Sequence, residues 1–158
     1  MLCITRGNLL NCNCNFILHQ ANSQKRMGAG LALKIAKRYP QVVRVDNEFP
    51  LKGAERLGKY SVAKVEEDKW VVNLYAQNFP GKAKTMREQA ERYLYLESSI
   101  TSFIQVLLKK ELKENRKYKI GLPYKLGSDL AGGEWGRVEE ILIDISERFK
   151  VDFYVFKL

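Results

Sequence analysis

The chain has 158 residues, of which 46% are hydrophobic and 28% are charged, and this is the size and composition of one globular domain with a buried core. No stretch approaches the roughly 20 consecutive apolar residues that a membrane-spanning helix needs, and no basic start followed by an apolar run indicates a signal peptide. We therefore expect a single domain over residues 1–158 that has no membrane partner, while the net charge of +9 at pH 7 permits an anionic one.

Apolar runs and amphipathic helices alternate along the chain. In order we predict strands at 2–5 and 16–19, a helix at 31–39, a hairpin of strands at 60–65 and 70–75, a helix at 87–112, a strand at 118–122, a helix at 135–149 and a strand at 151–156. Strands that alternate with helices predict an α/β fold whose sheet is covered by helices on both faces.

Each predicted helix has one apolar face. In the first, Leu31, Ile35 and Tyr39 share a face, and Pro40 is expected to end the helix. The long helix at 87–112 has a broad stripe that we expect to be buried: Leu94, Ile100, Phe103, Ile104, Leu107 and Leu108.

Two glycine-rich segments each follow a predicted strand and precede a predicted helix. The first contains Gly28 and Gly30, and the second runs from Gly127 to Gly133. Glycine lets the backbone approach a ligand closely, and the start of a helix offers N–H groups that suit a phosphate. Because ligands in such folds bind beyond the carboxyl ends of strands, both segments can meet at one edge of the sheet. The pair predicts a ligand with two phosphates, or with a phosphate and a sugar.

Two common phosphate-binding motifs do not fit this pattern. A dinucleotide-binding loop would have glycine or alanine three residues after Gly30, where this chain has Leu33, and the loop before Gly28 is too long for that tight turn. There is no Gly-Lys-Ser or Gly-Lys-Thr either, which excludes a P-loop.

The cysteine pattern bears on compartment and metal binding. Cys3, Cys12 and Cys14 are odd in number and closely spaced, which favours a reducing, cytoplasmic location over a disulfide framework. Cys12 and Cys14 together with His19 lack paired Cys-x-x-Cys spacing, so we predict no metal and no cofactor.

The basic charge leaves nucleic acid open as a partner. Much of the excess lies in one cluster: Lys109, Lys110, Lys113, Arg116, Lys117 and Lys119. This cluster lies at a helix end, where cations favour the helix dipole. With Tyr118 as its single aromatic residue, it lacks the interleaved aromatic residues of a surface that stacks single strands. A solvated basic surface is therefore our preferred interpretation, with an RNA-binding module as the alternative.

Several short motifs occur in an order that resembles the macrodomain family, which binds ADP-ribose. They are Gly7-Asn8-Leu9, Leu18-His19-Gln20-Ala21-Asn22, Met27-Gly28-Ala29-Gly30-Leu31-Ala32, Asn73-Leu74-Tyr75-Ala76-Gln77, and Pro123 with Gly127–Gly133 before Trp135. The resemblance covers nearly the whole chain and implies a three-layer α/β/α fold with a mixed central sheet. It is strongest to short members that remove the phosphate from ADP-ribose 1''-phosphate or release ADP-ribose from protein carboxylates.

The resemblance also implies site residues. Asn22 would hydrogen-bond the distal ribose, the loop before the first helix would wrap that ribose and one phosphate, and the second loop would hold the diphosphate. The implied ligand-binding set is Asn8, Asn22, Met27, Gly28, Ala29, Gly30, Gly127, Ser128, Leu130, Ala131 and Gly132.

The chain departs from the family pattern at positions that matter for chemistry. Asn8 replaces the aspartate that receives the adenine amino group, Asp129 replaces a glycine, and Ala131 stands where deglycosylating members have their catalytic acid. Their catalytic lysine lies in a loop comparable to 79–85, where Lys82 and Lys84 are both available. The candidate catalytic residues are thus Asn22, Asp129 and His19.

The expected function is binding of ADP-ribose or ADP-ribose 1''-phosphate, with hydrolysis of a terminal group. ADP-ribosylated protein would be a further partner. The alternatives are a non-catalytic ADP-ribose-binding module and the RNA-binding module named above.

Overall fold

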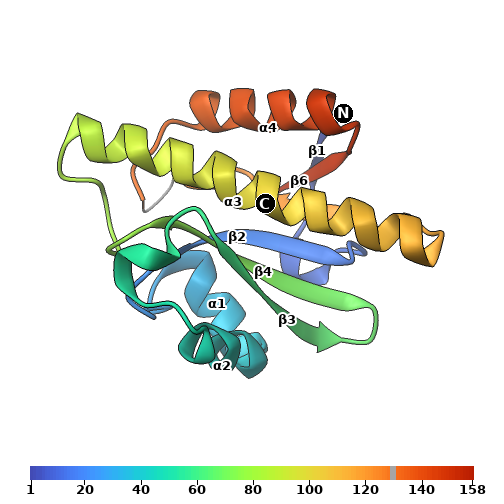
Figure 1. Cartoon of the computed structure of the whole chain (residues 1–158), viewed down its shortest axis with the longest axis horizontal. Helices are drawn as coiled ribbons and strands as arrows, with labels where there is room; N and C mark the ends of the chain where they lie inside the picture. Colours follow the sequence, from blue (N-terminus) through green and yellow to red (C-terminus); the bar gives the residue numbers. More distant parts are fainter. Residues whose placement is uncertain (129–130) are drawn as a thin grey trace.

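The computed structural model describes residues 1–128 and 131–158. Within these ranges six strands form one sheet in the order β1-β6-β5-β2-β4-β3 (Figure 1). Their bounds are Leu2–Arg6 (β1), Phe16–Asn22 (β2), Tyr60–Glu66 (β3), Lys69–Gln77 (β4), Ile120–Pro123 (β5) and Phe153–Lys157 (β6). Strand β3 pairs antiparallel with β4, whereas the other neighbouring strands pair in parallel. The predicted mixed sheet is confirmed.

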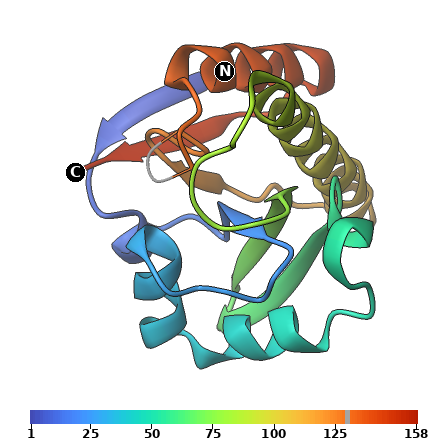
Figure 2. The ribbon, with the colours of Figure 1, turned by 90° about the vertical axis from the view of Figure 1, so that its left-hand side faces the viewer.

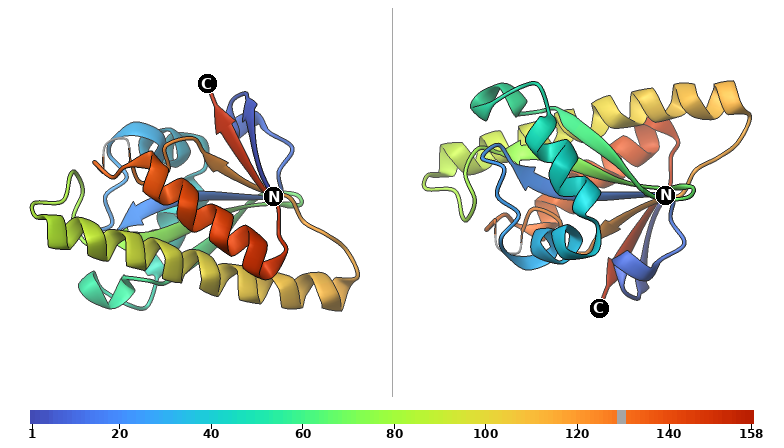
Figure 3. Two further views of the ribbon diagram at one scale, coloured as in Figure 1. Left: turned by 90° about the horizontal axis from the view of Figure 1, so that it is seen from above. Right: turned by 90° about the horizontal axis from the view of Figure 1, so that it is seen from below.

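Helices cover both faces of this sheet, which makes three layers. Helices α1 (Gly30–Arg38) and α2 (Pro40–Glu48) lie on one face, and α3 (Met86–Glu114) and α4 (Trp135–Phe149) lie on the other (Figures 1 and 3). Two short 3-10 turns, Leu9–Asn11 and Gly53–Arg56, join the chain between elements. None of the helices in the described part of the chain is long and apolar enough to cross a membrane.

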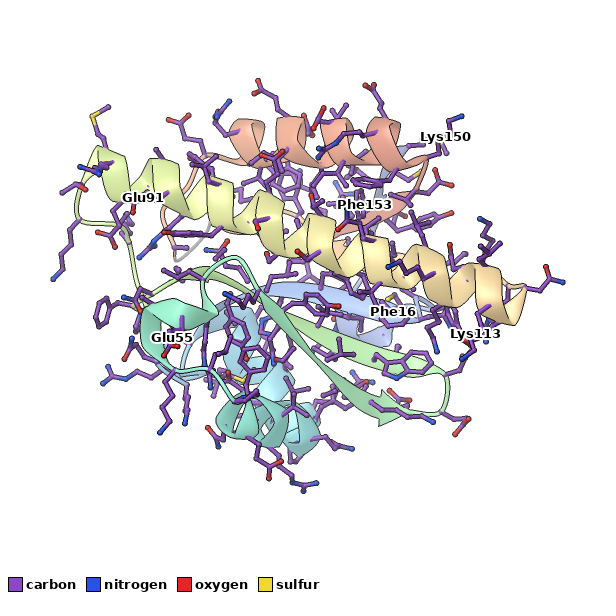
Figure 4. The ribbon with its side chains drawn as sticks, in the orientation of Figure 1. Phe16, Glu55, Glu91, Lys113, Lys150 and Phe153 are labelled. Atoms are coloured by element: carbon purple, nitrogen blue, oxygen red, sulfur yellow. The ribbon has the colours of Figure 1, made fainter. Side chains whose placement is uncertain are left out.

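The central strands are apolar on both faces because both are covered. Along β2, Phe16 and Leu18 pack into the core beneath α3 and α4, while Ile17 between them packs into the core beneath α1 and α2. In Figure 4 Phe16 lies below α3 and Phe153 lies between α3 and α4, and both belong to this core. A continuous apolar run is typical of a buried parallel strand, and this is why these strands could be predicted from the sequence.

The structure corrects two expectations about the helices. Pro40 ends α1 as predicted, but it is also the first residue of α2, an unpredicted helix, because the first helical position does not need an N–H group. Leu94 was expected to be buried and is 64% exposed. It precedes Ile100 by one and two-thirds turns, which places it off the buried stripe, and Leu96 occupies the stripe instead.

Candidate functional site

A cleft opens at the edge of the sheet where the parallel strands end. Figure 2 looks onto this edge, where the segment after β2 (blue), the segment after β4 (lime) and the segment after β5 (orange) come together. The cleft has a volume of about 360 Å³. Its lining residues are His19, Gln20, Asn22, Arg26, Gly28, Ala29, Gly30, Leu31, Ala32, Gln77, Pro80, Gly81, Pro123, Tyr124, Lys125, Leu126, Gly127 and Ala131. The predicted meeting of the two glycine segments is confirmed.

One wall of the cleft is the N-terminus of α1. Residues Gly30, Leu31 and Ala32 line the cleft and form the first turn, whose N–H groups have no partner within the helix. The N-cap residue Ala29 has no side chain that could accept from them, and the first turn contains no acidic residue. The positive end of the helix dipole therefore faces the cleft, and no acidic side chain of this first turn competes with a bound anion.

The loop before this helix is shaped by the side chain of Asn22. Its Oδ1 accepts from the backbone N–H groups of Gln24 (3.0 Å) and Arg26 (3.4 Å), and its Nδ2 donates to the carbonyl of Arg26 (2.7 Å). The first contact is an Asx-turn. The side chain of Asn22 thus stabilises its own loop, and the same residue lines the cleft. Its structural role is therefore compatible with the predicted contact to a ligand.

The opposite wall is the second glycine segment, whose ends are tied together by a hydrogen bond from Gly133 N to Gly127 O (3.2 Å). Gly127 has a φ of +69°, and a Cβ there would come within 2.6 Å of Gln20 Oε1. Gln20 Nε2 in turn donates to Gln77 Oε1 (2.6 Å). This hydrogen bond links β2 to the end of β4, and Gln20 packs closely against Gly127 of the loop.

The charges at the cleft favour an anion. Arg26 and Lys125 line it, and among the lining residues that the structure describes no side chain is acidic. Asp129, the predicted carboxylate of the second loop, lies outside the described residues, as does Leu130.

His19 lies at the base of the cleft and is buried, at 2% exposed. Its Nε2 is 2.5 Å from Asn73 Oδ1. Asn73 Nδ2 donates to Ser61 Oγ (3.1 Å), so its oxygen faces the histidine, and Nε2 must carry the hydrogen. In this tautomer Nδ1 of His19 carries a lone pair and can accept a hydrogen bond.

This contact chain continues beneath the sheet to a buried ion pair. Tyr75 donates to Asp46 Oδ1 (2.7 Å), so Ser61, 2.9 Å away, donates to Tyr75. Asp46 Oδ1 also accepts from Arg56 Nη1 (2.8 Å), and both charged side chains are almost completely buried. Each donor in the chain points toward the carboxylate, which fixes the direction of every hydrogen bond up to His19.

Stability should depend on pH through His19. Burial lowers the pKa of this imidazole below 6.5, although Asn73 and Asp46 oppose the shift. Below pH 6.5 the unfolded chain binds the proton more readily than the folded one, so the free energy of unfolding should fall as the pH drops from about 6.5. We expect urea denaturation to show this decline in the wild type and a smaller one in His19→Gln. Because His19 is the only histidine, equal declines in both proteins would contradict this account.

Comparison with known proteins identifies the fold. No protein-family model and no curated protein sequence matches the chain. Among solved structures it is similar to a Streptomyces coelicolor macrodomain protein (TM-score 0.70, 22% identity, 100% of this chain and 99% of that chain). It is also similar to the Mycobacterium tuberculosis DarG macrodomain (TM-score 0.70, 19% identity, 100% of this chain and 98% of that chain). A third similar structure is the Trypanosoma brucei macrodomain in complex with ADP-ribose (TM-score 0.66, 15% identity, 98% of this chain and 63% of that chain).

The chain has the macrodomain fold. The predicted fold class is therefore confirmed, including helices on both faces of a mixed sheet. At identities below 25% the likeness concerns the fold, and the roles of individual residues in this macrodomain fold stay predictions.

The predicted site residues that the structure describes fall into two groups in this macrodomain fold. His19, Asn22, Gly28, Ala29, Gly30, Gly127 and Ala131 line the cleft. Asn8, Met27, Ser128 and Gly132 are described but are not among the lining residues. Two of these four have local partners: Asn8 Oδ1 accepts from Leu10 N (3.0 Å), and Ser128 Oγ donates to Lys125 O (2.9 Å). Asn8 is exposed and its Oδ1 has a second lone pair, so the adenine contact expected of Asn8 stays a prediction.

Several cleft residues were not predicted. Gln20, Gln77, Tyr124 and Lys125 each lie in or beside a motif, and all of them are at or after the carboxyl end of a strand. Their position near strand ends could have indicated them as cleft residues, since the carboxyl ends of parallel strands share one edge of the sheet. Of the two candidate lysines, Lys82 lies against the second glycine segment, because a Cβ at Gly132 would come within 2.7 Å of Lys82 Cγ.

The structure also bears on the other candidate partners. The three cysteines are free thiols, and in residues 1–128 and 131–158 no group of three or more His, Cys, Asp or Glu side chains is placed to hold a metal. In the basic cluster, Lys110 pairs with Glu114 (2.8 Å) and Arg116 with Asp68 (2.9 Å). Part of its charge is thus neutralised locally.

Proposed function

We propose that this chain binds ADP-ribose and its derivatives in the cleft between the two glycine segments. The observation that carries the proposal is the open first turn of α1 facing Gly127 and Ala131 across a cleft with cationic lining residues. A helix N-terminus together with Arg26 and Lys125 suits a diphosphate. The similar Trypanosoma brucei macrodomain in complex with ADP-ribose supports this choice of ligand.

We further propose that the bound molecule is hydrolysed at its terminal group, which is the 1''-phosphate or an ester to a protein carboxylate. His19 is the candidate base, because burial keeps the imidazole neutral near pH 7 and its Nε2–H is committed to Asn73. Nδ1 would then accept a proton from the attacking water. Asn22 would orient the distal ribose and the amides of the glycine segments would stabilise developing charge, with Asp129 as the second candidate base.

A non-catalytic ADP-ribose-binding module is the second candidate. The observation that favours it is Ala131, which lines the cleft where the hydrolases that this chain resembles carry their acid. A methyl group cannot transfer a proton, so turnover would depend on His19 or Asp129 alone.

Calorimetry with ADP-ribose, run beside two hydrolysis assays, separates these candidates. We expect saturable binding, phosphate release from ADP-ribose 1''-phosphate or ADP-ribose release from a modified protein carboxylate, and loss of that turnover in His19→Gln with affinity retained. Binding without turnover of either substrate would support the module, and absence of binding would overturn both.

A further inference from the structure

One buried side chain on α3 joins two segments that line the cleft. Arg92 is 3% exposed. Its Nη1 donates to Gly81 O (2.7 Å) in the segment after β4, and to Ala131 O (3.1 Å) in the second glycine segment. Its Nη2 donates to Phe79 O (3.3 Å). Gly81 and Ala131 both line the cleft, so the guanidinium lies directly behind this part of its lining.

Stability alone does not account for this arrangement. Burial disfavours the charged form of Arg92 and lowers its pKa, and the ion pair with Glu88 (3.3 Å) involves a carboxylate that is one-third exposed. Nε is buried and has no hydrogen-bond partner within the described part of the chain. A buried cation held mainly by backbone carbonyls is a costly way to stabilise a fold. What the buried guanidinium does provide is a set of hydrogen bonds to three backbone carbonyls that belong to two separate segments.

The segment after β4 borders two hollows. A second hollow of about 290 Å³ is lined by Gln77 and Pro80, which also line the cleft. The segment therefore has open space beside it at two places, and polar contacts take the place of close packing there. Gln77 Nε2 holds it at Phe79 O (2.9 Å), and Arg92 holds it at Phe79 and Gly81.

We propose that Arg92 is a positioning residue that sets the spacing between the 79–81 segment and the second glycine segment, and thereby the position of the cleft wall that these two segments form together. Nη1 alone donates to a carbonyl of each segment, and Nη2 adds a second contact to the 79–81 segment, so one guanidinium bridges the two. A lysine at this position keeps the charge but has a single, compact ammonium group. Its side chain is also one bond shorter, so the ammonium would fall short of the position of Nη1 and would not reach the carbonyls of both segments.

The test compares Arg92→Lys with Leu107→Ala. Leu107 is buried on the same helix and is not among the described residues that line the cleft, so its truncation destabilises the fold without touching the cleft. In hydrogen exchange we expect Arg92→Lys to speed exchange of segments 79–84 and 126–133 together, with a fall of about tenfold in affinity for ADP-ribose. We expect Leu107→Ala to lower the thermal midpoint at least as much and to keep the wild-type affinity.

Two outcomes would overturn the proposal. One is faster exchange in only one of the two segments, and the other is unchanged affinity when both exchange faster. The affinity measurement rests on the proposed function, whereas the exchange measurement needs no ligand. If the wild type fails to bind ADP-ribose, the proposed function is wrong, and hydrogen exchange alone decides the claim about Arg92. If Arg92→Lys does not fold, nuclear Overhauser contacts in the wild type decide. We expect them from the Arg92 guanidinium to both Gly81 and Ala131, and contacts to one alone would contradict the bridge.

Discussion

Replacing Gly28 with alanine should lower the affinity for ADP-ribose at least tenfold, which is about 1.4 kcal/mol, while the free energy of unfolding stays unchanged. Gly28 lines the cleft, its φ lies outside the left-handed region, and a Cβ there would meet nothing within 4 Å. The added methyl group therefore strains nothing in the free protein, yet it occupies space where the backbone would approach the nucleotide. Calorimetry and urea denaturation measure the two effects separately.

Gly136→Ala is the matched control. A Cβ at Gly136 also meets nothing within 4 Å, but Gly136 lies in the first turn of α4 and is not among the described lining residues. Alanine in a helix is favoured over glycine by roughly 0.5–1 kcal/mol, so this variant should be slightly more stable and should bind as the wild type does. Wild-type affinity in Gly28→Ala would show that the first glycine segment does not contact the ligand.

Replacing Asp46 with asparagine should lower the free energy of unfolding by about 3–5 kcal/mol. The side chain of Arg56 is 0% exposed and that of Asp46 is 3% exposed, so the substitution leaves a guanidinium charge buried without its counter-ion. The asparagine oxygen can still accept from Tyr75, which confines the change to the charge. Urea denaturation at pH 7 is the measurement, and the loss is a large share of the stability of an ordinary domain.

Asp68→Asn and a double variant provide the controls for this second prediction. Asp68 pairs with Arg116 through two contacts of 2.9 and 3.0 Å, but both side chains are exposed, so its loss should have a much smaller effect. Adding Arg56→Met to Asp46→Asn removes the stranded charge and should recover part of the lost stability. Similar losses for Asp46→Asn and Asp68→Asn would contradict the description of the buried pair.

The elements and the edge that carries the cleft could be predicted from local patterns. Apolar runs of four or more residues indicate buried strands, and glycines placed between a strand and a helix indicate where the backbone approaches a ligand. Because β2 and β5 run in parallel, their carboxyl ends meet, and this brings Gly28 and Gly127 to one cleft. Helix α2 is not predicted, because Pro40 after an amphipathic helix indicates the end of that helix, although the same proline also suits the first position of a new one.

The polar contacts that organise the cleft could not be predicted, because strand pairing and helix packing bring their members together. Asp46, Asn73 and His19 come from three elements, and β2–β4 pairing places His19 beside Asn73. Arg92 did leave a signal. It precedes Leu96 by four residues and Ile100 by eight, so it lies on the buried stripe of α3, where a charged side chain indicates a specific partner.

The most direct test of the account is titration of the uniformly 15N-labelled chain with ADP-ribose, followed by amide NMR. We predict that the amides of residues 28–32 and of the second glycine segment shift together and saturate at one ligand concentration. Shifts confined to one of these segments, shifts located at the basic end of α3, or no shifts at millimolar ADP-ribose would contradict the claim that both segments bind a single nucleotide.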